Sequence, residues 1–220
     1  MKTSESIPVS GGSGRLNPEL QISIHGADGS LSTFTQDEPA LVQRIIKESQ
    51  RPEFFAQGRI ILAGPSSLTT FVVSNIARID LAGEGISAWK PKPSSEAPDL
   101  VEISQQEFLG EAEDREWQHV ERPKRQHAPG QQFVGYLDIQ MVNGQHVYLK
   151  FHGVAALPAE RLQRVHSFLT LPSLSFRMPG GGRGIVNLRK AAQFTAYPGP
   201  AEVPADAWVA KDRQTRQELT

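Results

Sequence analysis

The sequence of 220 residues contains no cysteine, and this absence excludes several kinds of site at once. Without thiols the chain can form no disulfide, no thiolate nucleophile and no cysteine-ligated zinc or iron–sulfur centre. A chain without cysteine suits a reducing compartment, and we expect the protein to be cytoplasmic.

Long hydrophobic runs are also missing. The apolar stretches are short, as in Ile60-Ile61-Leu62-Ala63, whereas a membrane-spanning helix needs about 20 apolar residues. The first residues lead into polar sequence without the apolar core of a secretory signal. We therefore expect neither a membrane contact nor an export signal.

Catalytic and metal-binding motifs are scarce as well. No G-x-S-x-G elbow and no H-E-x-x-H pair occurs, and the acidic residues crowd a polar stretch around residues 107–116 that is typical of a solvated surface. Among the six histidines, His146, His152 and His166 lie near one another in sequence but lack metal-ligand spacing. We expect no enzyme activity, no metal and no cofactor.

Hydrophobic residues make up only 38% of the chain, beside 16 prolines and 19 glycines, which indicates folded modules separated by polar segments. We expect a disordered tail over residues 1–17, a first module over 18–87, a linker over 88–130, a second module over 131–200 and a C-terminal tail over 201–220. Within the linker, Ser104 and Glu107 have the spacing of a capping box and predict a helix over 105–120.

The two modules follow the same order of predicted elements. The first has a strand at 20–24 and a return strand at 31–34, and the second has strands at 137–141 and 147–151 joined by an Asn-Gly turn. Helices follow at 38–48 and 158–168, each with a proline in its first turn. Later hairpins are predicted at 58–73 and 174–186, and final strands at 79–81 and 193–196.

Local sequence matches support a repeat of this order. Val42-Gln43-Arg44-Ile45 and Leu162-Gln163-Arg164-Val165 share an apolar-Gln-Arg-apolar pattern, and Asn75 to Arg78 resembles Asn187 to Lys190. We predict an α+β protein made of two tandem ββαββ units, an internal duplication with mainly antiparallel sheets and one helix each. The alternative is two unrelated α+β modules that share generic turns.

Charge differs between the two halves. Residues 18–86 carry 5 basic and 8 acidic side chains, whereas residues 128–200 carry 7 basic and 2 acidic ones. Either the halves attract each other, or the basic half meets an anionic partner. For the second alternative, the glycine-rich string from Met178 to Gly184 suggests an anion or nucleic-acid site made of Arg177, Arg183, Arg189 and Lys190.

The predicted linker helix offers a second binding hypothesis. Phe108, Leu109 and Trp117 lie at helical spacing and form a narrow apolar stripe that either packs on a module or docks into a partner. We expect a non-enzymatic binding or assembly protein with a protein partner or self-association, and nucleic-acid binding through the basic module as the alternative.

Overall fold

A computed structural model describes residues 19–51, 53–64, 66–83, 99–113, 128–197, 205, 207 and 208. It is an α+β structure with eleven strands and three α-helices in the described part of the chain. Among these residues no helix is both long enough and apolar enough to cross a membrane.

The first half begins with a β-hairpin and a helix. Strands β1 (Leu20–Gly26) and β2 (Leu31–Gln36) pair antiparallel, and helix α1 (Pro39–Ser49) follows with its proline at the start. A hairpin of β3 (Arg59–Ala63) and β4 (Leu68–Val72) comes next, and then β5 (Ile76–Gly83). Strand β5 returns to pair with β1.

The second half has the same order of elements. Strands β7 (Gln132–Met141) and β8 (His146–Val154) form a hairpin, and α3 (Pro158–Leu169) follows. Strands β9 (Ser173–Arg177) and β10 (Arg183–Asn187) form a second hairpin, and β11 (Ala191–Tyr197) returns to pair with β7. The predicted hairpins and both predicted module helices are thus confirmed, with boundaries shifted by a few residues.

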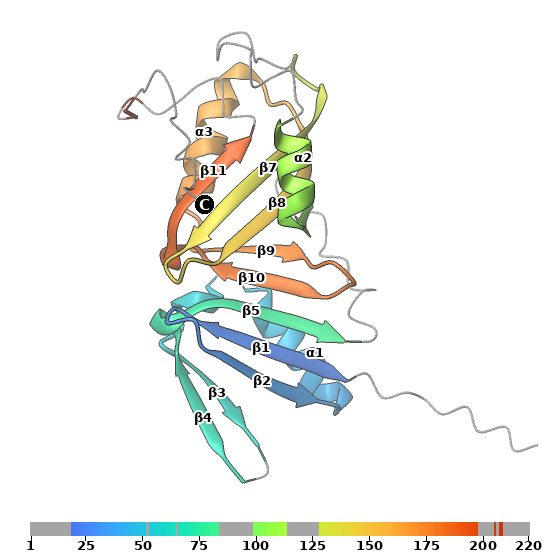
Figure 1. Cartoon of the computed structure of the whole chain (residues 1–220), viewed down its shortest axis with the longest axis vertical. Helices are drawn as coiled ribbons and strands as arrows, with labels where there is room; N and C mark the ends of the chain where they lie inside the picture. Colours follow the sequence, from blue (N-terminus) through green and yellow to red (C-terminus); the bar gives the residue numbers. More distant parts are fainter. Residues whose placement is uncertain are drawn as a thin grey trace, which may run out of the picture.

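One nine-stranded sheet runs through both halves in the order β11-β7-β8-β6-β9-β10-β5-β1-β2 (Figure 1). The halves join where β10 pairs antiparallel with β5. The expected separate sheets are therefore merged into one, because this pairing covers an edge strand of each half. The hairpin β3–β4 stands outside the sheet as a separate two-stranded element.

The segment expected to be a linker contributes to the fold. Residues Leu100–Ile103 form strand β6, which the sequence did not predict, and β6 lies between β8 and β9. It pairs antiparallel with β8 and parallel with β9, the one parallel pairing in the described sheet. Only four residues long and flanked by polar sequence, β6 gives too weak a local signal to identify, because its stability comes from its two neighbours.

Helix α2 (Gln105–Glu113) follows β6 immediately. The Ser104 hydroxyl accepts a hydrogen bond from the backbone N–H of Glu107 at 3.1 Å, as the capping-box spacing predicts. The predicted helix continued to residue 120, and its last seven residues lie outside the described part of the chain.

Three apolar clusters stabilise the fold. The first joins β1 and β5 to α1 and the β3–β4 hairpin, the second fills the concave side of the second half, and the third lies under α2. Their best-buried members include Leu20, Ile76, Tyr136, Ile139, Leu149 and Ile185. Ile185 of β10 belongs to the first cluster, so the core of the first half is completed by a strand of the second half.

Candidate interaction surface

The β3–β4 hairpin is the most exposed apolar element of the described structure. Arg59 to Ala63 pairs with Leu68 to Val72 in register, and the backbone N–H of Gly64 donates to the Ser67 carbonyl at 2.8 Å to close the turn. The β-branched residues in both strands favour extended backbone, and the residues of the connecting turn reverse the chain direction. The hairpin projects from the lower end of the molecule in Figure 1.

One face of this hairpin packs against the first core. Ile60, Leu62 and Phe71 are partly buried beside the cluster that includes α1. The Phe71 ring meets the Phe34 ring of β2 edge to face, with 5.8 Å between their centroids. This contact fixes the position of the hairpin without any backbone pairing to β2.

The opposite face of the hairpin is apolar and open to solvent. Ile61 is 49% exposed, Leu68 69% and Val72 52%. The alternation along each strand places these three side chains on one side, together with Ala63 and Thr70. Gathered exposed aliphatic side chains of this kind mark interaction surfaces more often than isolated ones do.

The edges of the hairpin are unprotected as well. In the described ranges no strand pairs with the outer edge of β3 or of β4. Natural proteins usually protect such edges with charges, prolines or bulges, but β4 carries no charged residue and β3 carries only Arg59. The backbone groups of both edges can therefore accept another strand.

A shallow cleft opens at the base of the hairpin. It has a volume of about 380 Å³ and is lined by residues 55–58 before β3, by Val73 and Ser74 after β4, and by Asn187, Arg189 and Lys190 after β10. Arg189 also borders a neighbouring hollow of about 250 Å³ beside the end of α3. Neither Arg189 nor Lys190 has an ion-pair partner within the described residues.

Only part of the predicted anion site gathers at this cleft. Arg189 and Lys190 lie together on the short turn after β10, whereas Arg177 forms a two-pronged ion pair with Asp99, at 3.1 and 2.7 Å. Arg183 is largely buried in β10, and this burial lowers the pKa of its guanidinium to about 10. The four predicted residues therefore do not form one site.

The glycine-rich string is a packed turn rather than an open loop. Gly180, Gly181 and Gly182 all have positive φ, between 79° and 99°. A Cβ on Gly182 would come within 2.5 Å of the Leu81 carbonyl oxygen, so the loop needs glycine there to lie against β5. Close packing explains this glycine without an anion.

The predicted docking stripe is also divided. Phe108 is only 5% exposed and packs against the rings of Tyr136, Tyr148 and Tyr197. Leu109 is 43% exposed, and Trp117 lies outside the described residues. Phe108 thus anchors α2 to the sheet and is not available to a partner in this conformation.

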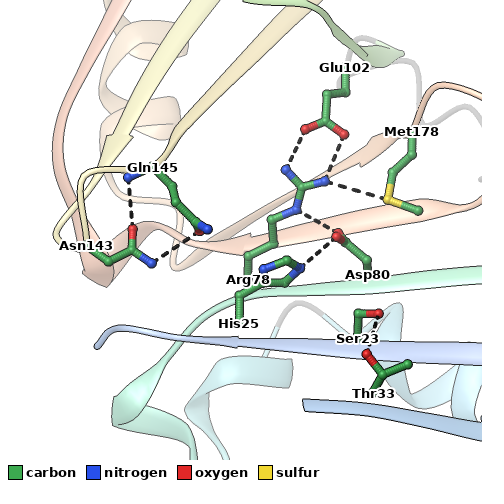
Figure 2. Close-up of polar contacts among 9 residues, drawn as sticks. All are labelled: Ser23, His25, Thr33, Arg78, Asp80, Glu102, Asn143, Gln145 and Met178. Atoms are coloured by element: carbon green, nitrogen blue, oxygen red, sulfur yellow. Dashed lines mark hydrogen bonds and ion pairs between the residues drawn. The ribbon is translucent and has the colours of Figure 1, made fainter. Parts of the chain in front are cut away.

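A buried polar network connects the two halves beside this surface (Figure 2). The Arg78 guanidinium of β5 donates to both carboxylate oxygens of Glu102 in β6 and, at 2.7 Å, to Asp80. Asp80 in turn contacts the His25 ring at 3.0 Å, and Arg78 also lies over the Phe176 ring. Burial lowers the pKa of Arg78, but the hydrogen bonds from Glu102 and the charge of Asp80 outweigh this effect and raise the pKa overall.

Every charge in this network is matched, so it has the character of a structural joint. Arg78 and Glu102 are each 14% exposed, and no cavity adjoins them in the described structure. The histidines expected to be unspecialised are also dispersed: His146 pairs with Asp138 at 2.7 Å, and no group of three potential metal ligands gathers among the described residues.

The sequence analysis did not recognise the exposed hairpin face, although a signal was present. In Ile60-Ile61-Leu62 consecutive residues are apolar, so both faces of the strand carry aliphatic side chains. A strand that covers a core on one side needs only alternate apolar residues, and the extra one at Ile61 indicated a second apolar surface.

Comparisons with known proteins give no relative. No family model, no curated protein and no solved structure matches this chain.

Proposed function

We propose that this is a non-enzymatic binding and assembly protein that contacts other polypeptides through the β3–β4 hairpin. The observation that carries the proposal is the exposed aliphatic face of Ile61, Leu68 and Val72 on an element with two unpaired strand edges. Apolar area offers affinity, and free backbone groups offer directional hydrogen bonds to an incoming strand.

The proposal includes an internal duplication. We define the first set as β1, β2, α1, β3, β4 and β5, and the second set as β7, β8, α3, β9, β10 and β11. In both sets the last strand pairs with the first, which pairs with the second, and both helices follow the first hairpin. This agreement of order and pairing supports two copies of one unit.

One of the sequence matches used for the duplication does not fit this alignment. Asn75 is the last residue of the short turn of helix after β4, whereas Asn187 is the last residue of β10 and precedes the corresponding turn. Aligned by elements, Asn187 corresponds to Val72. The proposal therefore depends on topology and not on this phrase.

A pair of matched variants tests the binding role. Val72 and Val154 each end a strand and are 52% and 54% exposed, but Val154 lies far along the sheet, at the end of β8. We expect V72K to remove polypeptides captured from a lysate, or to lower the native mass of a self-associated form, whereas V154K leaves both unchanged. Equal behaviour of V72K, V154K and the original chain would contradict the proposal.

A second candidate function is anion binding at the cleft, with nucleic acid as the ligand. It is favoured by Arg189 and Lys190, which line the cleft without an ion-pair partner among the described residues. Affinity for nucleic acid should then fall as salt rises, and R189A with K190A should reduce the slope of that dependence by about two. An unchanged slope would exclude this role for the cleft.

A further inference from the structure

We propose that the first set binds an extended polypeptide segment as an additional strand between β2 and β3. The inference rests on the proposed duplication and names the class of partner for the proposed binding function. It starts from a difference between the two sets in how their second hairpin is attached.

In the second set a single strand connects the two hairpins. The order β11-β7-β8-β6-β9-β10 places β6 between β8 and β9, so that the hairpin β9–β10 belongs to the sheet. The corresponding order in the first set is β5-β1-β2 followed by β3-β4, and no described strand lies between β2 and β3. The position that β6 occupies in one set is therefore open in the other.

Burial of the flanking side chains shows the effect of the missing strand. In the second set the residues beside β6 are well covered: Leu149 is 0% exposed, Leu174 7% and Phe176 3%, and Leu100 of β6 itself is 5% exposed. The residues that flank the open position in the first set are only partly buried, namely Phe34 of β2, Ile60 and Leu62 of β3 and Phe71 of β4. These four side chains share one core, as the residues beside β6 do.

The pairing pattern of β6 defines how the added strand would run. By analogy with β6, it would be antiparallel to β2 and parallel to β3. Such a strand forms backbone hydrogen bonds on both of its edges. An edge strand of a folded sheet has only one edge free, so the occupant must be a linear segment without a pairing partner of its own.

The chemistry of the position describes the segment further. Phe34, Ile60, Leu62 and Phe71 present an apolar surface on the inner side, so alternate residues of the ligand should be aliphatic or aromatic. Strand β2 carries no charge and β3 only Arg59, so the flanking strands select for hydrophobic alternation and not for a charge pattern. The ligand cannot place proline at a position that must donate to β2 or β3.

Selection of peptides on the full chain tests this inference. A phage library of linear peptides of about 10 residues, the upper range of strand length, is the probe. The selected peptide is then synthesised, with a control of the same composition that carries proline at alternate positions. At a free peptide concentration of about 100 times Kd, amide exchange at the binding edge should slow about 100-fold.

We expect the slowed amides to lie in both β2 and β3, and the proline control to have no effect. Selection of no alternating peptide, or protection confined to β4 or to β11, would overturn the inference. Two further results would do the same: β2 and β3 amides that lose protection on deletion of residues 1–18, or that gain it with protein concentration alone, because the occupant would then be the chain itself.

The V72K variant separates this inference from the proposed function. The Val72 side chain lies on the outer face of the hairpin, away from the inner apolar side of the open position. If V72K retains the 100-fold protection by peptide but captures the same polypeptides as the original chain, the outer face has failed and strand addition stands. If V72K loses capture and no peptide protects β2 and β3, the outer face stands and strand addition has failed.

Discussion

At the scale of single residues, charge burial separates structural ion pairs from incidental ones. Arg78 and Glu102 are mostly withdrawn from water, and Asp80 and His25 complete their hydrogen bonding. Arg177 and Asp99 have the same fork geometry, but their side chains are 56% and 59% exposed. The two pairs should therefore differ greatly in their contribution to stability.

Removal of the two arginines measures this difference. We expect R78M to lower the free energy of unfolding by about 3–5 kcal/mol, because it leaves two carboxylates buried without their cation. We expect R177M to lower it by less than about 1 kcal/mol, because its partner stays solvated. Urea titration of both variants gives the values, and similar losses would show that the Arg78 network does not stabilise the joint.

A second prediction at this scale concerns glycines. A Cβ on Gly184 in β10 would lie 2.2 Å from the buried Phe176 ring, whereas nothing lies within 4 Å of a Cβ on Gly110 in α2. G184A should destabilise the protein by about 1–3 kcal/mol through overpacking, and G110A should stabilise α2 by about 0.5–1 kcal/mol. Thermal unfolding of the two variants should show shifts of opposite sign, and a neutral G184A would contradict the packing described.

At the scale of elements, the hairpins and the module helices could be predicted because their signals are local. Alternating residues with an Asn-Gly turn specify β7–β8, and a proline before an amphipathic stretch specifies α1 and α3. Strand β6 could not be predicted, because four residues form a strand only when two separate neighbours offer their edges. The division between Phe108 and Leu109 likewise depends on which side of α2 meets the sheet.

Helix α2 provides the test at this scale. Phe108 is buried among three tyrosines, and α2 is held further by hydrogen bonds from Tyr136 and Lys150 to Glu111. F108A should therefore cost about 3–5 kcal/mol of stability, as other buried phenylalanines do, whereas L109A should change it little. Unfolding curves of both variants decide this, and an equally stable F108A would return Phe108 to the predicted docking role.

At the scale of the whole molecule, the two sets are held as one structure. Beside the β5–β10 pairing, Asn187 donates a side-chain hydrogen bond to the Ile76 carbonyl at 3.0 Å, and Asn143 donates one to the Gly26 carbonyl at 3.1 Å. The basic and acidic halves recognised in the sequence thus lie against each other. Which strands would join them could not be read from the sequence, since several uncharged strands offer similar edges.

This joint predicts a single cooperative transition. All three tyrosines of the chain lie in the second half, so fluorotyrosine NMR reports on that half while far-UV circular dichroism reports on the whole. The two signals should share one urea midpoint. Separate midpoints would mean that the halves unfold independently and that the β5–β10 pairing contributes little.

The central claim is that binding occurs on the outer face of the β3–β4 hairpin, and photo-crosslinking from that face tests it most directly. Leu68, which is 69% exposed, is replaced by a photoreactive phenylalanine, and Leu157, which is 55% exposed before α3, is replaced in a matched control. We predict covalent adducts to polypeptide from position 68 and none from position 157. Equal adducts from both positions, or adducts from position 157 alone, would contradict the claim.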